Sequence, residues 1–486
     1  MDSLQPVLAV LARVLMGFSV AFLVPLLWSL WAGEGGHARV WAAGFGATLV
    51  AGWGLGWLLR HHSREMQPRD GFLLVTLVWV ALPACAAVPL MWTVPGIEWA
   101  DAYFEAMSAL TATGATALAG LDRLPLSVNI WRCFLQFIGG LGIILLVVAV
   151  LPLLGLGGMQ LYRAETPGPL KDDKLTPRIA ETARGLWTVY FALSALCLVS
   201  YRAAGMGWPD AFMYMCTTMG LGGFSPHDAS FAQFDSPVIE AVAIVFMTLA
   251  GVSFLRYFAV WRGRSTRVLV RDPEVQAYAF VLLASVFAIS FVLHAHGVYD
   301  SFAASLRAAA FHVVSLGTTT GYAATDYAAW PPFAPVLMIF LGCFASCAGS
   351  TGGGIKMVRM VLLLKQAQRE LVRIIHPRVV NPVTLGGATV PATVLAAVLA
   401  FMLIYGASII GLTLVMLLSG LDLVTAFSAV IVCVNNIGPG LGLVGPVSNF
   451  GVLNDFQLWV LSFAMLLGRL ELLSVLVLFT ARFWRK

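Results

Sequence analysis

The stretch Thr111-Ala-Thr-Gly114-Ala-Thr116 is the first of four short clusters of Gly, Thr and Asn that separate apolar segments of this 486-residue chain. The other three clusters read Thr217-Thr-Met-Gly-Leu-Gly-Gly223-Phe-Ser225, Thr318-Thr-Thr-Gly321-Tyr322 and Asn435-Asn-Ile-Gly438-Pro-Gly440. Their reference glycines, Gly114, Gly223, Gly321 and Gly438, recur at comparable intervals of roughly a hundred residues. These clusters are copies of one unit, and a unit repeated four times predicts a pore.

The composition predicts a membrane protein. Hydrophobic residues make up 59% of the chain and charged residues 11%, and the mean hydropathy is +0.87. Soluble domains carry about a quarter charged residues. A bilayer core about 30 Å thick requires about 20 apolar residues per helix. We therefore expect an all-α polytopic membrane protein.

Ten apolar stretches are long enough to cross a bilayer. They run roughly over residues 7–31, 40–59, 71–91, 131–154, 186–204, 238–260, 276–294, 335–364, 391–418 and 456–480. Each glycine cluster is also preceded by a shorter apolar piece, which we expect to enter the membrane and return. The sequence thus predicts four repeats of helix, short pore helix and helix.

The basic residues predict the orientation. Most of the 29 Lys and Arg residues fall in five stretches that alternate with the glycine clusters. These stretches are 60–69, 163–184, 256–271, 356–378 and 482–486. Basic loops of membrane proteins prefer the cytoplasm, so we expect these loops and the C-terminus there and the glycine clusters near an acidic external face. The net charge of +5 is spread over these loops and is no sign of nucleic-acid binding.

The short pieces predict an arrangement that favours cations. Each begins with an aspartate, at Asp101, Asp210, Asp300 or Asp422. Aspartate accepts hydrogen bonds from the unpaired N–H groups at a helix start, so we expect four capped pore helices. Their negative C-terminal ends would converge on the glycine clusters, where backbone carbonyls could replace the hydration shell of an alkali ion. Small residues that merely allow close helix packing are the alternative, but four matching clusters favour the pore.

The third repeat contains a second glycine-rich stretch. The apolar run 333–366 is too long for one crossing, and Ala348-Gly-Ser-Thr-Gly-Gly-Gly354 interrupts it. Glycine lowers helix stability by about 1 kcal/mol relative to alanine, so we expect an unwound loop that lies across the pore, or else a packing kink. Arg469 lies inside the last span. We expect this buried charge to act beside the pore or to form an ion pair involving Glu471.

Other motifs do not support an enzyme. Gly440-Leu-Gly442-Leu-Val-Gly445 lacks a surrounding βαβ unit, and the stretch 349–356 has Ile355 where a phosphate-binding loop requires lysine. The histidines show no zinc-binding spacing, and no general base accompanies Ser350. Residues 356–378 predict a basic amphipathic helix at the inner surface, where it would meet membrane lipids or a cytosolic partner.

With these motifs in order, the chain resembles the TrkH family, the membrane subunits of bacterial Trk potassium-uptake systems within the Trk/Ktr/HKT superfamily. The likeness covers nearly all residues and includes two helices before the first repeat, which the related KtrB subunits lack. It implies four pseudo-symmetric repeats around one pore in the inner membrane, with the filter mouth facing the periplasm. The corresponding divisions are two N-terminal helices at 1–68 and pore repeats at 69–160, 161–265, 266–382 and 383–486.

The resemblance also implies the site residues. The potassium filter would be formed by Ala112, Thr113, Gly114, Leu221, Gly222, Gly223, Thr319, Thr320, Gly321, Asn436, Ile437 and Gly438. Ala112 stands where many relatives have threonine, and Gly440 is an alternative to Gly438. The gate would be formed by Gly349, Ser350, Thr351, Gly352, Gly353, Gly354, Lys356 and Arg469.

The implied function is uptake of potassium and rubidium, with no cofactor other than K⁺ ions in the filter. The implied assembly is a homodimer with one pore per subunit, regulated by a cytosolic nucleotide-binding ring like TrkA. Two other readings are open. A symporter coupled to protons or sodium would need intramembrane carboxylates, for which Glu471 is the main candidate. An intramembrane enzyme would need a catalytic group such as Ser350.

Overall fold

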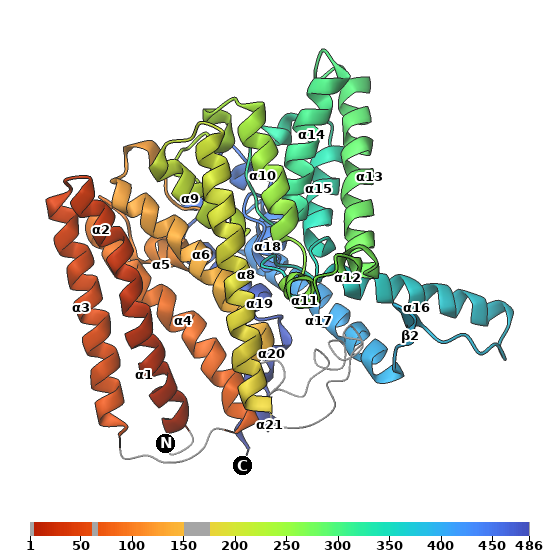
Figure 1. The fold of residues 1–486 in the computed structure, drawn as a ribbon, viewed down its shortest axis with the longest axis horizontal. Helices are drawn as coiled ribbons and strands as arrows, with labels where there is room; N and C mark the ends of the chain where they lie inside the picture. The colour runs from red at the N-terminus through yellow and green to blue at the C-terminus, as the bar shows by residue number, and fades with distance from the viewer. Residues whose placement is uncertain (1–3, 61–66, 150–174, 486) are drawn as a thin grey trace.

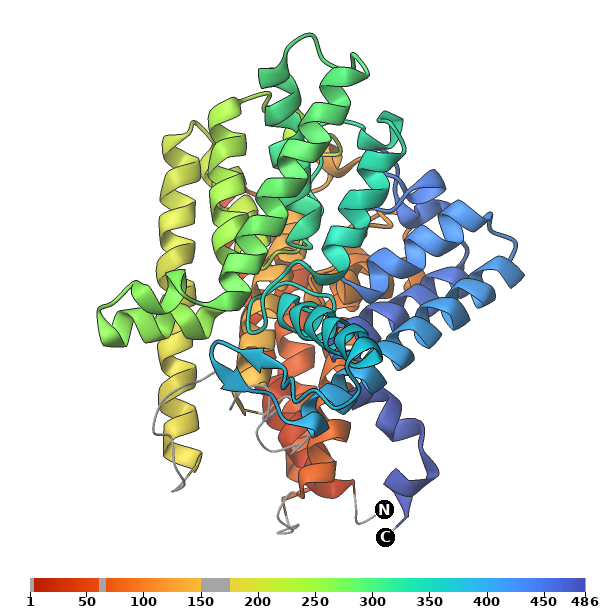
Figure 2. The ribbon, with the colours of Figure 1, turned by 90° about the vertical axis from the view of Figure 1, so that its right-hand side faces the viewer.

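The computed structural model describes residues 4–60, 67–149 and 175–485. The predicted end of the fourth span, the division at 160 and the basic residues of 163–174 lie outside these ranges. Within them the chain is almost entirely helical, which confirms the all-α prediction (Figure 1). Both termini lie at the same end of the helix bundle in Figures 1 and 2.

Three helices precede the first repeat. These are α1 (Gln5–Ser19), α2 (Leu23–Trp31) and α3 (Gly35–Leu58). A single 3₁₀ turn joins α1 to α2, so that Gln5–Trp31 forms one apolar span. Phe22 in that turn stacks on Trp131 of the first repeat at 4.5 Å between ring centroids. The N-terminal helices are therefore packed onto the repeats through buried aromatic rings.

The rest of the core consists of four units, each built from a helix, a short helix and a helix. The first contains α4 (Pro68–Thr93), α5 (Trp99–Leu110) and α6 (Leu126–Ala149), and the second α8 (Leu175–Ala203), α9 (Trp208–Met219) and α10 (Pro237–Ala250). The third contains α13 (Pro273–Ala295), α14 (Phe302–Gly317) and α15 (Phe333–Phe344), and the fourth α17 (Ala392–Leu418), α18 (Leu423–Val434) and α19 (Asp455–Arg469). The middle helices α5, α9, α14 and α18 are the predicted pore helices.

Six helices in the described part of the chain are long and apolar enough to cross a membrane, or eight if each of two bent pairs is one span. The bent pairs are α10 with α11 (Phe254–Gly263), at 83°, and α19 with residues Leu473–Phe479, at 109°. The remaining predicted crossings correspond to α3 and to the third repeat's last span. That span is divided into α15 and α16 (Met357–Ile375) by residues 345–356, as the glycines predicted.

Several elements extend sideways from the bundle. Figure 1 shows α16 projecting from it, and Figure 2 shows a small hairpin beside α16. The hairpin pairs β1 (Thr384–Leu385) with β2 (Ala388–Thr389) in antiparallel register. The intervening Gly386 and Gly387 both have positive φ, as a two-residue hairpin turn requires.

The remaining short helices are α12 (Arg267–Val270), α20 (Leu473–Leu476) and α21 (Ala481–Trp484).

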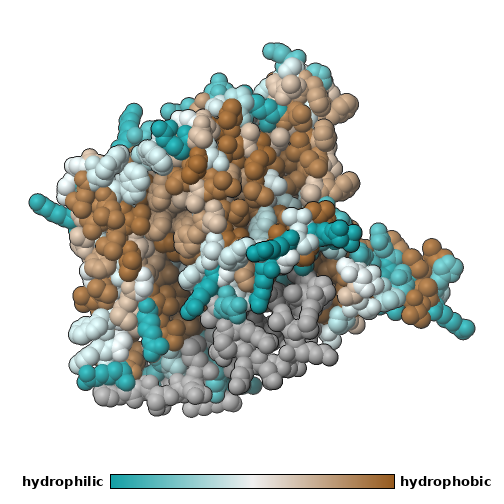
Figure 3. Space-filling view, in the orientation of Figure 1, coloured by the Kyte–Doolittle hydropathy of each residue, from teal (hydrophilic) through white to brown (hydrophobic). Residues whose placement is uncertain are grey.

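The outer flank of the bundle is apolar. On α13 the side chains of Phe280, Leu283, Phe287 and Phe291 are all more than half exposed and share one helix face. Figure 3 shows hydrophobic side chains over this flank, bounded by hydrophilic side chains along the upper edge and below. Such a continuous apolar surface would be unstable in water and fits a lipid environment.

The predicted aspartate caps are right at one pore helix and displaced at the others. Asp422 caps α18, with its carboxylate accepting from the Thr425 N–H at 3.0 Å. Asp101 and Asp210 instead lie in the first turns of α5 and α9. Asp300 precedes the true cap of α14, Ser301, whose hydroxyl accepts from the Ala304 N–H. Serine and aspartate are about equally good caps, so composition alone could not separate adjacent candidates.

Candidate functional site

The four glycine clusters adopt the same backbone path. Each pore helix ends four residues before its reference glycine. The N–H of the residue just before the glycine then donates to a carbonyl in the last turns of the helix. These bonds are Thr113 to Ser108 (2.8 Å), Gly222 to Thr217 (2.9 Å), Thr320 to Ser315 (2.8 Å) and Ile437 to Val432 (2.8 Å). Four segments far apart in sequence therefore leave their helices in the same way.

Left-handed backbone recurs at alternate positions of each cluster. The reference glycines have φ between 76° and 106°. The residues two positions earlier are not glycine and still have positive φ: Ala112 (50°), Leu221 (51°), Thr319 (64°) and Asn436 (52°). Such a conformation costs a non-glycine residue about 1–2 kcal/mol and persists where the surroundings enforce it. Its recurrence at matched positions indicates a shared functional geometry.

The four clusters close into a ring. A β-carbon on each reference glycine would overlap or crowd the carbonyl oxygen of the residue before the glycine in the next cluster. The pairs are Gly114 with Gly222, Gly223 with Thr320, Gly321 with Ile437, and Gly438 with Thr113. The clusters therefore follow one another around a common axis in sequence order. We call them ring segments 1 to 4, with the boundaries quoted in the sequence analysis.

The fourth segment contains two candidate glycines, and its geometry distinguishes them. Gly438 has a φ of 106° and lies against the Thr113 carbonyl of segment 1. Gly440 lies instead against the side chains of Val444 and Ser428. Gly438 thus occupies the position equivalent to the other three reference glycines.

Buried side chains support the ring from behind. Hydroxyl pairs link Thr111 to Thr113 (2.7 Å) and Thr318 to Thr320 (2.8 Å). The Asn436 amide donates to the Thr113 hydroxyl at 2.9 Å and so joins segment 4 to segment 1. Because each pore helix ends at the ring and backbone carbonyls of all four segments meet there, the site suits a dehydrated monovalent cation.

An open cavity lies over the ring. All four ring segments contribute to its lining, which includes Gly114, Gly223, Gly321 and Pro439. At its rim His227 Nδ1 lies 2.5 Å from Asp122 Oδ1, and its Nε2 lies 3.4 Å from Asp210 Oδ1. The Asp210 carboxylate and, after it, Asp122 raise the pKa of His227 against the opposing effect of burial.

The glycine-rich break contacts the helix ends and the ring. The Gly353 N–H donates to the Thr319 hydroxyl at 2.9 Å. The Thr351 hydroxyl donates to the Met219 carbonyl at 3.0 Å, at the end of the second pore helix. Gly353 also lies against the Asn435 carbonyl, where a side chain would not fit. Residues 345–356 therefore touch three of the four repeats.

Three charged side chains hold this break. Arg469 donates from Nη1 to the Thr351 carbonyl (3.0 Å) and from Nη2 to the Gly139 carbonyl (2.9 Å), and it is 3% exposed. Lys356 Nζ donates to the Gly352 carbonyl. Glu274 Oε1, at the start of α13, accepts from the Ala348 N–H (2.7 Å) and the Val358 N–H (3.2 Å).

The alternative of an ion pair between Arg469 and Glu471 is wrong. Glu471 pairs instead with Arg359 of α16, at 2.6 Å, whereas Arg469 points to backbone carbonyls. Two helices meet at this point, and the backbone turns sharply after Arg469, with positive φ at Glu471 and Leu472. Neighbouring residues in sequence therefore face different elements.

Sequence reasoning missed several polar residues behind the ring. Arg132 and Glu105 form a buried ion pair at 2.7 Å, and Gln136 contacts segment 2. The available signal was the spacing of Arg132 and Gln136, which places two polar side chains on one face of an apolar span. Glu274 was also missed, since a glutamate near a helix start usually serves only the helix.

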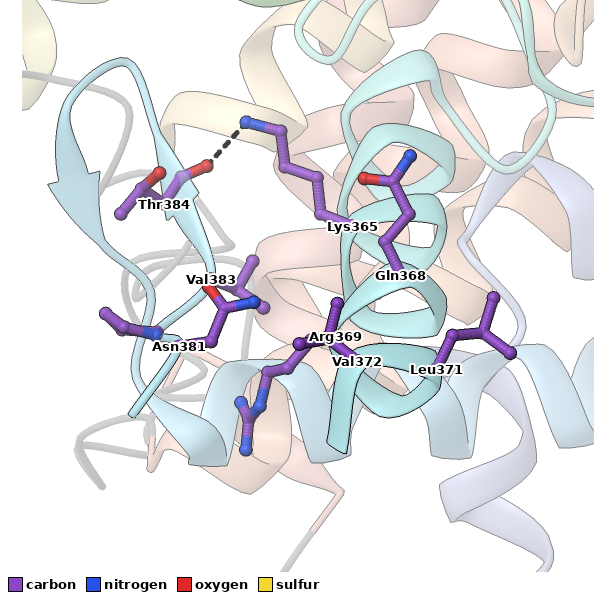
Figure 4. Close-up of a pocket in the computed structure, with 9 residues that line it drawn as sticks. Lys365, Gln368, Arg369, Leu371, Val372, Asn381, Val383 and Thr384 are labelled. Atoms are coloured by element: carbon purple, nitrogen blue, oxygen red, sulfur yellow. Dashed lines mark hydrogen bonds between the residues drawn. The ribbon is translucent and has the colours of Figure 1, made fainter. Parts of the chain in front are cut away.

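A separate groove lies between α16 and the hairpin (Figure 4). Its polar lining includes Lys365, Gln368, Arg369 and Asn381, and Lys365 Nζ donates to the Thr384 carbonyl at 2.7 Å. The groove is part of the arm that projects from the bundle, away from the ring. No group of His, Cys, Asp or Glu suited to holding a metal ion occurs in residues 4–60, 67–149 and 175–485.

Comparisons with known proteins show that this chain is similar to TrkH proteins over nearly its full length. A family model described as "TrkH: Cation transport protein" matches residues 37–486. The Trk system potassium uptake protein TrkH of Salmonella typhimurium is 44% identical over 93% of each chain, and that of Vibrio parahaemolyticus is 42% identical over 99% of each. The crystal structure of the potassium transporter TrkH from Vibrio parahaemolyticus superimposes with a TM-score of 0.91 and 39% identity, covering 99% of each chain.

Proposed function

This chain belongs to the TrkH family of cation transport proteins, and on that basis we propose that it takes up potassium, and also rubidium, across the bacterial inner membrane as part of a Trk system. The family consists of transport proteins. This confirms the prediction that the chain is not an enzyme. Its relatives are named as potassium uptake proteins, and the ring suits a monovalent cation such as potassium.

The single observation that supports this proposal is the closed ring of four segments. In the proposal, the ion is bound by the carbonyls of Ala112 and Thr113, Leu221 and Gly222, Thr319 and Thr320, and Asn436 and Ile437, with the glycines Gly114, Gly223, Gly321 and Gly438 setting the backbone. Four equivalent positions offer the ion oxygen ligands from all sides. The glycines are required because each faces a neighbouring carbonyl at a distance that excludes a β-carbon.

The proposed gate is the break beneath the ring. Residues Gly349 to Gly354 would block the path in the resting state, held by Lys356 and Arg469 through the contacts described above. Opening would require these hydrogen bonds to be replaced or broken. The positive charge of Arg469 would also repel cations while the loop is in place.

Transport through this pore needs no energy source in the chain itself. At a membrane potential of 100 mV, negative inside, one entering cation gains about 2.3 kcal/mol, which supports about 50-fold accumulation. A proton- or sodium-coupled symporter is the alternative. Its main candidate carboxylate, Glu471, is engaged in the ion pair with Arg359, and that pairing favours uncoupled flow.

The proposed assembly follows the family. Two copies would form a homodimer, each with its own pore, and a TrkA-like nucleotide-binding ring would act from the cytosol on the side that carries both termini. Membrane lipids would surround the apolar flank. The filter mouth would face the periplasm, and the repeats would divide at 68, 160, 265 and 382.

Rubidium uptake by the purified protein in liposomes tests the proposal. Vesicles loaded with potassium and diluted into sodium medium should accumulate radioactive rubidium, and vesicles without protein should not. If flow is uncoupled, a proton or sodium gradient alone will drive no rubidium uptake when the potassium concentration is equal on both sides of the membrane. Absence of rubidium uptake would overturn the function, and uptake driven by either gradient alone would replace the channel with a symporter.

A further inference from the structure

Ring segment 2 is the least constrained of the four by its own sequence. It contains Gly220, Gly222 and Gly223, and glycine has the largest backbone freedom of any residue. Segments 1 and 3 have threonine at the position where segment 2 has Gly222, and those threonines form the hydroxyl pairs described above. Segment 2 therefore needs support from elsewhere in the molecule.

The chain that leaves the ring is held differently in segment 2. In the other three segments, the N–H group three residues after the reference glycine donates to a side chain of the pore helix. These bonds are Ala117 to Glu105 (2.9 Å), Ala324 to His312 Nε2 (3.1 Å) and Leu441 to Ser428 (3.0 Å). In segment 2 the equivalent residue is Pro226, which has no N–H.

The missing support comes from α6 of the first repeat. Asn129, Arg132 and Gln136 are spaced three and four residues apart and so share one face of this helix. Gln136 donates to the Gly222 carbonyl (2.8 Å) and accepts from the Phe224 N–H (3.0 Å). Its side chain thus brackets Gly223 from both sides.

Arg132 continues this support outward along segment 2. Its Nη1 donates to the Ser225 carbonyl at 3.2 Å, and its guanidinium lies 4.4 Å over the Phe224 ring. Asn129 adds a longer contact of 3.4 Å from its amide to the Pro226 carbonyl. From the pore helix α9, this stretch receives the Thr217 carbonyl, which accepts from the Gly222 N–H (2.9 Å), and the Tyr214 hydroxyl, which contacts the Ser225 hydroxyl (2.8 Å).

Arg132 also connects segment 2 to segment 1. Its Nε donates to Glu105 at 2.7 Å, and Glu105 accepts from the Thr116 hydroxyl and the Ala117 N–H beside segment 1. Arg132 is 1% exposed and Glu105 is fully buried. A buried pair with this many partners fixes geometry, because any displacement leaves a charged group without hydrogen bonds.

We propose that the polar stripe Asn129, Arg132 and Gln136 positions ring segment 2. By holding this segment in place, Arg132 and Gln136 determine how strictly the pore distinguishes potassium from sodium. The inference rests on the proposed function. Sodium is the smaller ion, so a segment free to move inward would coordinate it better and reduce the discrimination. These are positioning residues, acting through the backbone of Gly222 to Ser225.

The test uses the full-length protein in liposomes and measures the ratio of potassium to sodium permeability from reversal potentials. Gln136→Met removes both hydrogen bonds without leaving a buried charge, and it should lower the ratio about three- to tenfold, the range expected for one or two neutral hydrogen bonds. Arg132→Met should lower the ratio at least as far. Arg132→Lys keeps the charge opposite Glu105 but loses the forked contacts, so it should restore the ratio only in part.

Gln457→Met is the matched control. Gln457 is also a buried glutamine (4% exposed), and at the start of α19 it donates to the Ser419 hydroxyl (2.9 Å) and accepts from the Asn454 N–H (3.0 Å), neither of which belongs to a ring segment. This variant should lose thermal stability and keep the parent ratio. Parent-like ratios in both Gln136→Met and Arg132→Met would overturn the inference, as would an equal loss in Gln457→Met. Failure of the parent to carry rubidium would instead overturn the proposed function.

Discussion

Glu274 accepts a hydrogen bond from the backbone N–H of Ala348 at 2.7 Å, and the same oxygen accepts from Val358 at 3.2 Å. One carboxylate thus holds both ends of the glycine-rich break. Its own position is fixed by Asp272, which accepts from the Glu274 N–H and pairs with Arg256 of α11 at 2.6 Å. The start of α13 therefore links the break to the helix that extends sideways after the second repeat.

Replacing Glu274 with glutamine should loosen the break. Hydrogen bonds to a charged group contribute about 1.5–3 kcal/mol and neutral ones about 1 kcal/mol, so the closed arrangement becomes less stable. Rubidium flux without any partner subunit should rise roughly threefold to tenfold, with the ion preference unchanged. Glu181→Gln is the control, because Glu181 is largely exposed. A flux equal to the parent's would show that Glu274 does not restrain the gate.

Deleting Gly349 to Gly354 should have a larger effect of the same sign. The deletion removes the residues that contact Met219, Asn435 and Arg469, so nothing remains to close the path below the ring. Rubidium uptake into liposomes should increase well beyond that of the parent. Removal of residues 384–389, the hairpin beside α16, serves as a deletion of equal length away from the ring. A deletion variant no leakier than this control would argue against gating.

Gly321→Ser should weaken discrimination of potassium against sodium. A β-carbon at this position would overlap the Ile437 carbonyl, and the φ of 89° is unfavourable for serine. The fourth segment must therefore shift. The relative permeability should fall about tenfold or more, the effect of about 1.4 kcal/mol of lost coordination. Gly406→Ser is the matched control, because nothing lies within 4 Å of a β-carbon there. Unchanged permeabilities would count against the filter assignment.

The sequence predicted the ring better than it predicted the residues that hold the ring. Apolar length, the four glycine clusters and the break at 348–354 are local signals, and each is found where expected. The left-handed conformations of Leu221 and Thr319 have no such signal. They are imposed by neighbouring segments from distant parts of the chain, because these residue types do not favour that backbone by themselves.

Long-range polar contacts were also beyond local reasoning. Arg132 lies near the start of an apolar span, where a single charge resembles a boundary residue. Its role depends on Glu105 and Ser225, which come from other elements. The spacing with Gln136 was the one clue available, since polar residues on a single face of a membrane helix indicate a polar partner.

His227 should make stability depend on pH at the outer rim. Its raised pKa means that charged His227 stabilises the folded state, with Asp210 as the main cause. Burial raises the pKa of Asp122, but hydrogen bonds from His227 and the Asp228 N–H together lower it, so this partner stays ionised. The stabilisation is fully present below the ordinary histidine pKa of about 6.5 and is lost as pH rises through the raised value.

Thermal unfolding of the parent and of His227→Gln should therefore differ most at pH below about 6 and converge in alkaline solution. The difference should be modest, because the rim is partly open to solvent. His296→Gln is the control, since His296 is exposed at the end of α13. A constant difference across the pH range would show that the charge on His227 plays no part.

A single polypeptide supplies all four sides of the ring, and this arrangement has an evolutionary consequence. In a tetramer of identical subunits, any mutation near the axis is made four times at once. In the present chain Pro226 lacks a hydrogen-bond donor just after segment 2, and the neighbouring helix α6 supplies the compensating side chains. Each quadrant of a ring made by one chain can therefore change separately, and unequal quadrants become a means of tuning ion preference in small steps.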